Sequence, residues 1–231
     1  MRHLIIGNGP AGVVAAETLR KRAPEDEITM LGAEPEPPYS RMALPYLLVG
    51  SIGEDGTYLR KDANHFEKLG IAQRRGRATA VDTVKREVRL DTGESLPYDR
   101  LLIATGVTPN RPPIPGIDLP NVLACWTLDD ARKILAVAKP GAEVVQMGAG
   151  FIGCIILEAL AARGAELVVV EMGDRMVPRM MPPKASELIH GWCERQGIRV
   201  ITGARVSEIR KSGEALSVSL TDGQAFAADL V

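Results

Sequence analysis

The sequence lacks an excess of charge of either sign, and it lacks long apolar runs. Its 28 basic and 29 acidic residues leave no basic field for binding nucleic acid or an anionic membrane. No apolar run approaches the ~20 residues of a membrane span. An apolar strand pattern begins two residues after Met1 and leaves no room for a secretory signal. We therefore expect no nucleic-acid partner, no membrane association and a cytoplasmic location.

Cysteine and histidine are also scarce. The three cysteines, Cys125, Cys154 and Cys193, are odd in number, far apart and free of any C-x-x-C spacing. This argues against a disulfide framework and against a thiolate metal site, so we interpret all three as reduced packing residues. His65 and His190 have no third ligand at a sensible spacing, and we expect no metal site.

Two glycine-rich turns stand out against this background. Each follows a short apolar run and precedes an Ala/Leu-rich stretch of helical pattern, at Gly7-Asn8-Gly9-Pro10-Ala11-Gly12 and at Gly148-Ala149-Gly150-Phe151-Ile152-Gly153. In such a turn the first glycine permits the bend, the second lets a pyrophosphate approach and the third lets the helix pack on the strand. The sequence therefore predicts two dinucleotide sites, with a turn that binds nothing as the alternative at each.

The pattern between the turns predicts a first α/β unit followed by a linker. We expect a helix to residue 22, a strand at 27–31, short helices at 46–49 and 64–69, antiparallel hairpins within 78–98 and a buried parallel strand at 101–104. Residues 109–120 hold five prolines and have the composition of a stiff linker. This gives domains at 1–110 and 121–231, joined by a linker at 111–120.

The same cycle restarts after the linker. The expected elements are a strand at 144–147, a helix at 151–163, a buried strand at 167–170, a helix at 183–196, a strand at 198–201 and a β-meander within 206–231. The second half thus repeats the strand, glycine turn and helix of the first.

The order of several motifs resembles a known family. Between and after the turns lie Pro37-Pro38-Tyr39-Ser40-Arg41, Tyr98-Asp99-Arg100-Leu101-Leu102-Ile103-Ala104-Thr105-Gly106 and Thr127-Leu128-Asp129-Asp130-Ala131. With the two turns, they resemble the pyridine nucleotide-disulfide oxidoreductase superfamily over the whole chain, closest to ferredoxin and rubredoxin reductases and NADH-linked nitrite reductases.

That resemblance implies a fold and two cofactors. The fold is α/β, with two Rossmann-like three-layer dinucleotide-binding domains that each carry a β-meander, and family members continue with the rest of an FAD domain and an interface domain. The first turn would hold FAD and the second NAD(H), and hydride would pass from nicotinamide to flavin.

The resemblance also implies cofactor contacts in the first half. Gly7, Gly9, Pro10, Ala11 and Gly12 would wrap the FAD pyrophosphate. Glu34 would bind the adenosine ribose, although Ala33 stands where relatives often have a further acid. Arg41 would lie near the flavin phosphates, Ala78 would offer backbone to adenine, and Thr105 and Gly106 would close the near side of FAD. Glu34 and Arg41 each have an ordinary surface residue as the alternative.

In the second half, the turn residues Gly148, Gly150, Phe151, Ile152 and Gly153 would bind NAD(H). We expect Phe151 and Ile152 mainly to pack the helix on the sheet, with lining of the cofactor as a second role. Glu171 ends a buried strand, where a carboxylate accepts hydrogen bonds from a ribose 2′-hydroxyl and repels a 2′-phosphate. This predicts NADH as coenzyme. Arg175 and Arg179 on the next loop could accommodate a phosphate, and a strand-end surface acid is the other alternative.

Four positions depart from the family pattern. Met42 stands where related oxidases carry a redox cysteine, so we expect no thiol chemistry at the flavin. Tyr46 replaces a lysine, Trp126 replaces an arginine that contacts FAD and is expected to pack instead, and Ile155 replaces an acid near the nicotinamide.

These inferences predict an FAD-dependent NADH oxidoreductase. Its electrons would pass to a small molecule or to an acceptor protein such as ferredoxin or rubredoxin, which the sequence does not identify, and a full-length form is expected to be a homodimer. The alternative is a nucleotide-binding or redox-sensing flavoprotein module with little turnover. Because chain from both sides of the inserted domain holds FAD in this architecture, we expect the 231-residue chain to bind FAD weakly.

Overall fold

The computed structural model describes residues 1–231, which divide into two compact units. The first unit comprises Met1–Arg41 and Glu54–Thr108, and the second comprises Met42–Gly53 and Pro109–Val231. Each unit is described by itself below. None of the helices combines the length and the apolarity that crossing a bilayer would require.

The first unit is built on a parallel sheet with strand order β3-β2-β1-β7. A separate antiparallel ribbon has the order β4-β5-β6. The elements of this unit are β1 (Arg2–Ile6), α1 (Pro10–Arg22), β2 (Glu27–Gly32), η2 (Glu54–Thr57), α3 (His65–Lys68), β3 (Ile71–Arg75), β4 (Ala78–Asp82), β5 (Glu87–Leu90), β6 (Ser95–Pro97) and β7 (Arg100–Ile103).

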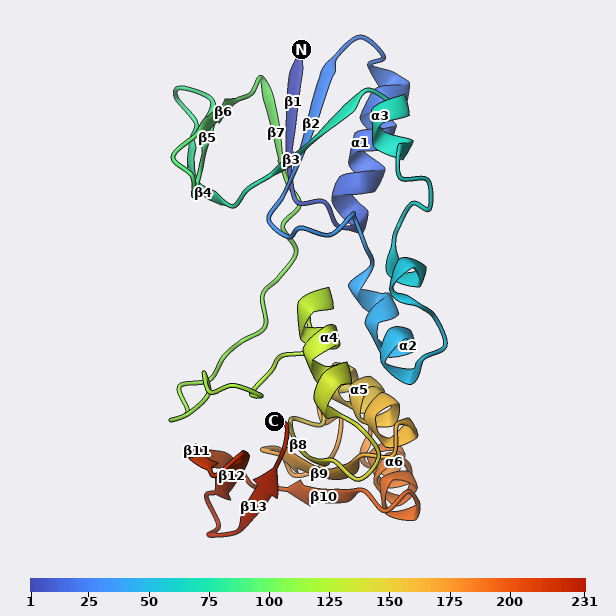
Figure 1. Ribbon diagram of the computed structural model, residues 1–231, viewed down its shortest axis with the longest axis vertical. Helices are drawn as coiled ribbons and strands as arrows, with labels where there is room; N and C mark the ends of the chain where they lie inside the picture. The colour runs from blue at the N-terminus through green and yellow to red at the C-terminus, as the bar shows by residue number, and fades with distance from the viewer. The chain divides into compact units, whose positions relative to one another are not determined.

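Alternation along β1 separates the two faces of this sheet. Ile5 packs with Val13 of α1 and Phe66 of α3, whereas Leu4 and Ile6 pack against the β4–β6 ribbon. Figure 1 shows the helices on one side of the sheet and the ribbon on the other. The expected three layers are therefore present, because successive side chains of a strand point to opposite faces.

A strand is present at 100–103, but the expectation that it is buried is wrong. β7 does pair in parallel with β1, but Leu102 is 41% and Ile103 62% exposed. The cause is position in the sheet: β7 is an edge strand with one neighbour, and a continuous apolar run does not reveal which strand lies at the edge.

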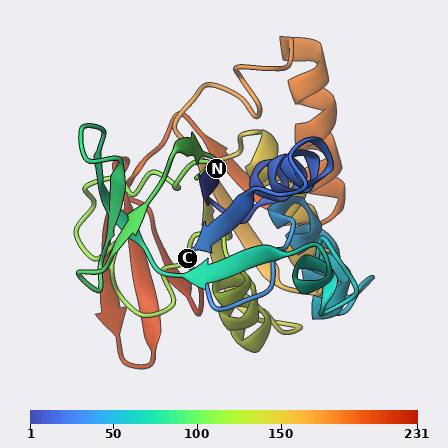
Figure 2. The same cartoon turned by 90° about the horizontal axis from the view of Figure 1, so that it is seen from above.

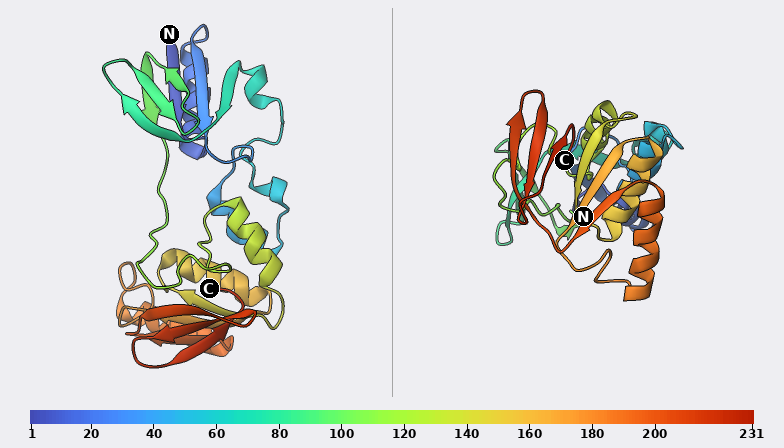
Figure 3. Two further views of the ribbon diagram at one scale, coloured as in Figure 1. Left: turned by 60° about the vertical axis from the view of Figure 1, so that its left-hand side comes forward. Right: turned by 90° about the horizontal axis from the view of Figure 1, so that it is seen from below.

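The second unit contains a parallel sheet of order β10-β9-β8 and an antiparallel meander of order β11-β12-β13. Figure 2 shows the meander (red) and α6 (orange) on opposite sides of this unit, and Figure 3 shows the meander strands side by side. Its elements are α2 (Leu44–Val49), α4 (Leu128–Val137), β8 (Glu143–Met147), α5 (Phe151–Ala162), β9 (Glu166–Glu171), α6 (Pro183–Arg195), β10 (Arg199–Thr202), β11 (Val206–Ser212), β12 (Ala215–Leu220) and β13 (Ala225–Ala228).

Two features of the second unit were not expected. The helix α4 begins at a capping box, in which Thr127 accepts from the Asp130 N–H and Asp130 accepts from the Thr127 N–H. The segment that contains α2 follows the first turn in the sequence but packs with α4 and α5. Arg163 ties these helices together by donating to the carbonyls of Leu48 (3.0 Å) and Ala138 (2.8 Å). η1 (Arg41–Ala43) spans the change of unit.

Candidate dinucleotide sites

The two glycine turns have the same backbone geometry. Gly7 and Gly148 have φ of +115° and +100°, values that favour glycine. The N-cap glycines match as closely, with φ and ψ of −74° and −175° at Gly9 and of −73° and −176° at Gly150. Each turn leaves its strand through one hydrogen bond of 2.8 Å to the neighbouring strand, from Gly7 N to Leu31 O and from Gly148 N to Val170 O.

Both turns present backbone donors at the start of a helix. The first helical hydrogen bonds run from Val13 N to Gly9 O (3.0 Å) and from Cys154 N to Gly150 O (2.9 Å). The N–H groups of residues 11–12 and 151–153 therefore have no partner within their helices, and the positive end of the helix dipole lies there. Such a terminus is suited to a pyrophosphate.

The glycines of each turn differ in the space around them. A Cβ at Gly12 would overlap the carbonyl oxygen of Gly7, and a Cβ at Gly153 would lie 2.5 Å from that of Gly148. At Gly9 and Gly150 an added Cβ would meet nothing within 4 Å. The third glycine is thus required by packing, whereas the second borders open space.

Glu34 and Arg41 are brought together by a third residue. The Tyr39 hydroxyl donates to Glu34 Oε2 (2.5 Å) and accepts from Arg41 Nη1 (2.8 Å), while Arg41 Nη2 lies 2.7 Å from Glu34 Oε1. Burial lowers the pKa of Arg41, but the hydrogen bond and charge of Glu34 and the contact with Tyr39 outweigh it and hold that pKa above its ordinary value. Tyr39 is 7% exposed. Sequence reasoning quoted its motif but missed its role, which only the fold shows.

The other first-unit candidates lie at strand ends. Thr105 and Gly106 are exposed and follow β7, and Gly106 has φ of +68°. The preceding residue, Ala104, donates from its N–H to Ile6 O (2.7 Å) and its carbonyl faces Gly7, so this segment adjoins the first turn. Ala78 begins β4.

Glu171 is tied into the second turn. It is 7% exposed, and its oxygens accept from Ala149 N and from Gly173 N, both at 2.7 Å. The alternative that Glu171 is an exposed surface acid is therefore wrong. A carboxylate has about four acceptor positions, so these two bonds leave capacity for ribose hydroxyls.

Phe151 and Ile152 lie at the N-terminus of α5 and are 49% and 57% exposed. The expectation that they pack the helix on the sheet is wrong. They lie on the first turn of the helix, beyond the strands, where an apolar residue borders the open space in front of the turn.

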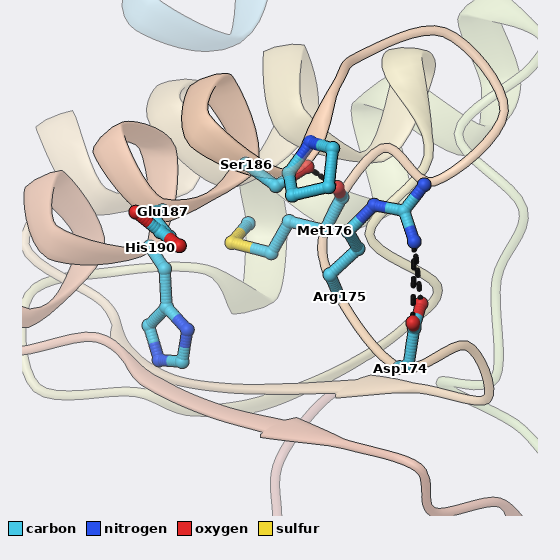
Figure 4. A pocket seen from close by; sticks show the side chains of 7 residues that line it. Asp174, Arg175, Met176, Ser186, Glu187 and His190 are labelled. Carbon is cyan, nitrogen blue, oxygen red and sulfur yellow. Dashed lines mark hydrogen bonds and ion pairs between the residues drawn. The ribbon is translucent and has the colours of Figure 1, made fainter.

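A pocket follows Glu171 along the chain, between the loop at residues 174–176 and the start of α6 (Figure 4). The Arg175 guanidinium pairs with Asp174 (3.0 Å) and donates to Pro178 O (3.1 Å), and Ser186 donates to Met176 O (2.7 Å). Its other lining residues are Pro183, Glu187 and His190. Two carboxylates, Asp174 and Glu187, line this pocket beside one guanidinium, Arg175, so the pocket has no excess of positive charge.

All three cysteines are unbridged, and burial raises the pKa of each thiol. The pKa of Cys125 rises to about 12 and that of Cys154 to about 11. Thiols with raised pKa values are poor nucleophiles at neutral pH. His65 pairs with Glu17 (2.7 Å) and His190 lies 3.8 Å from Glu194, and no group of three or more His, Cys, Asp or Glu side chains is arranged to hold a metal.

Comparisons with known proteins extend over the whole chain. A family model described as pyridine nucleotide-disulphide oxidoreductase matches residues 1–231. The epsilon subunit of the NADH-dependent phenylglyoxylate dehydrogenase of Aromatoleum evansii is 30% identical over 231 residues, which are 100% of this chain and 55% of the relative. The ferredoxin–NAD(+) reductase component of the biphenyl dioxygenase system of Paraburkholderia xenovorans is 30% identical over 98% of this chain and 56% of its own length.

Among solved structures, a ferredoxin reductase from Rhodopseudomonas palustris superimposes with a TM-score of 0.92 at 31% identity, covering 100% of this chain and 57% of the other. The chain therefore spans about half the length of the relatives it matches.

Proposed function

The chain belongs to the pyridine nucleotide-disulphide oxidoreductase family, and from that premise we propose that it is the dinucleotide-binding half of an FAD-dependent NADH oxidoreductase. FAD binds at the Gly7 turn and NADH at the Gly148 turn. The observation that carries the proposal is the matched pair of turns, which are similar in φ, in N-cap geometry and in the hydrogen bond that anchors them. Two equivalent anion sites on one chain suit two dinucleotides.

Glu34, Arg41 and Tyr39 support the first site. The Glu34 carboxylate uses one acceptor position on each oxygen for Tyr39 and Arg41, and the remaining positions can receive ribose hydroxyls. The Arg41 guanidinium stays charged, so it can supply positive charge to a diphosphate. The network orients both groups before the cofactor arrives, which reduces the entropy lost on binding.

Glu171 and Arg175 support NADH rather than NADPH at the second site. A buried carboxylate at the end of β9 would repel a 2′-phosphate. Arg175 could offset this, but its terminal nitrogens already bind Asp174 and Pro178 O. Charge-assisted hydrogen bonds are worth roughly 1.5–3 kcal/mol each, so the preference for NADH should be about ten- to a hundredfold. Binding constants for NADH and NADPH check this, and equal constants would contradict it.

Electrons leave the flavin for an acceptor other than an active-site disulfide. Met42, an exposed thioether, occupies the position of the redox cysteine in related oxidases, and the three thiols have raised pKa values. Two of the named relatives are ferredoxin reductases, which favours a ferredoxin-type protein as acceptor in the whole protein.

The test is anaerobic addition of NADH to the FAD-loaded chain. We expect the flavin absorbance to bleach without a thiolate–flavin charge-transfer band, and an added ferredoxin to restore it with steady NADH consumption. Bleaching without turnover with any acceptor would favour a sensing module. A chain that binds neither FAD nor NADH would overturn the proposal.

A further inference from the structure

Gln146 occupies the strand position beneath the second glycine turn, two residues before Gly148. Its Nε2 donates to Gly148 O (2.9 Å) and to Gly153 O (3.0 Å). Only the nitrogen of the amide can donate to two carbonyls, so the orientation of the side chain is fixed. The side chain therefore joins the first glycine of the turn to the first turn of α5.

The first glycine turn provides an internal reference for this position. There the residue two before Gly7 is Ile5, which is fully buried and makes only apolar contacts. A Cβ built on Gly12 would lie 3.4 Å from an Ile5 methyl, and a Cβ built on Gly153 would lie 3.1 Å from Gln146 Nε2. The two side chains thus fill the same place beneath the third glycine, one with a methyl group and the other with an amide.

The amide carries a cost that Ile5 does not. Gln146 Oε1 is buried and has no hydrogen-bond partner. An unsatisfied buried acceptor disfavours folding, and the Ile5 arrangement shows that an apolar residue supports the same turn. The two bonds donated by Nε2 are what this position gains in exchange.

Both turns are anchored by a hydrogen bond to the neighbouring strand, but the second has an additional support. The Gly7 peptide donates to Leu31 O, and the Gly148 peptide donates to Val170 O and also accepts from the Gln146 amide.

We propose that Gln146 is a positioning residue for the dinucleotide at the second turn, because its amide holds the Gly148 peptide and the first turn of α5 in the spacing that directs their N–H groups at a diphosphate. This rests on the proposed function of that turn. Gln146 makes no contact with the ligand itself, and an apolar residue here leaves the turn folded but less ordered.

The experiment compares Gln146→Ile, which reproduces the first turn, and Gln146→Met, which keeps the length of the side chain without the amide. Calorimetric titration uses NADH and ADP-ribose, which carry the diphosphate, and a competition assay uses adenosine, which lacks it. Loss of two neutral hydrogen bonds predicts about five- to thirtyfold weaker binding of NADH and ADP-ribose by both variants. The affinity for adenosine should stay within error of the parent value. The melting temperature should stay the same or rise.

Gln224→Met is the matched control. The Gln224 amide also makes two side-chain bonds in the second unit, to Asp222 and Arg199, but it lies at the turn between β12 and β13. We expect it to leave all three affinities unchanged. Equal NADH affinity in the parent and in the Gln146 variants would overturn this inference alone, as would equal losses for adenosine and NADH. A parent chain that binds neither NADH nor ADP-ribose would overturn the proposed function as well.

Discussion

The Gly7 and Gly148 turns have the same backbone geometry, but different side chains support them. At the first turn the strand residue beside it, Gly32, is bare, and the Asn8 side chain of the turn fills the space against it. At the second turn the pattern is reversed, since Ala149 of the turn is small and Glu171 of the strand reaches it with a hydrogen bond of 2.7 Å. The same turn geometry can thus be supported by a side chain of the turn itself or by a side chain of the neighbouring strand.

Because different residues support the two turns, the acid of each unit lies in a different environment. In the second unit the acid is the last residue of β9 and its carboxylate is buried against the turn. In the first unit Glu34 lies beyond β2, and it is held by Tyr39 and Arg41 with 28% of its side chain exposed. A buried acid that supports a turn and a partly exposed acid in an ion pair should respond differently to substitution.

The largest expected effect separates the first glycines of the two turns. Gly7→Ala places a Cβ in the Ala104 carbonyl, and we expect it to cost more than about 4 kcal/mol. Gly148→Ala meets no atom of residues 1–231 within 4 Å, so in this chain only the positive φ counts, at roughly 1–3 kcal/mol. Denaturant unfolding measures both, because Trp126 and Trp192 report on the second unit and tyrosine signals mainly on the first. Equal costs would show that the turns are buttressed alike.

The next effect compares the two acids. Glu171→Gln sets an amide NH2 against a backbone N–H that the carboxylate had satisfied, and should destabilise the second unit by about 1–3 kcal/mol. Glu34→Gln should cost less than about 1 kcal/mol, because Arg41 keeps access to water and the Tyr39 hydroxyl can still donate to the oxygen of the amide. Thermal melting of the two variants beside the parent tests this order, and a larger loss for Glu34→Gln would reverse our assignment of roles.

The smallest effect is a difference in acid sensitivity. Hydrogen bonds from Arg2 lower the pKa of Asp99 to about 2, and hydrogen bonding to Arg60 lowers the pKa of Glu17. Carboxyl groups with lowered pKa values stabilise the fold above their ordinary pKa, and that contribution is lost as pH falls from about 4 towards 2. In the second unit Asp222 alone has a clearly lowered pKa. Tyrosine signals should therefore change at higher pH than tryptophan emission, and the opposite order would contradict the account.

Periodicity and turn chemistry predicted most elements of both units. The glycine turns, the meander and the helix at 183–195 follow from the spacing of apolar residues and from turn and capping residues, which are local features of the sequence. The burial of β7 could not be read in this way, because it depends on which strands are neighbours. The capping box at Thr127 is a local signal from which α4 could have been predicted, but the segment was interpreted only as part of a family motif.

The candidate sites divide along the same line. The glycine turns and Glu171 each follow or end a strand of a parallel sheet, so the sequence alone indicates that they lie at the same edge of the sheet. Tyr39 and Gln146 act through hydrogen bonds to residues whose direction is fixed only in the folded chain. Glu171 was interpreted as a ribose ligand or a surface acid, and its bonds to Ala149 and Gly173 show a further role in supporting the turn.

The central claim is that each turn holds its own dinucleotide, and the second glycines test it most directly. An alanine Cβ at Gly9 or Gly150 meets no protein atom within 4 Å, and neither residue has a positive φ, so both variants should fold as the parent does. Each Cβ occupies the space in front of its turn. We predict that in paired titrations Gly9→Ala loses FAD binding and keeps NADH, while Gly150→Ala loses NADH and keeps FAD. Loss of both nucleotides in either variant, or of neither, would contradict the claim.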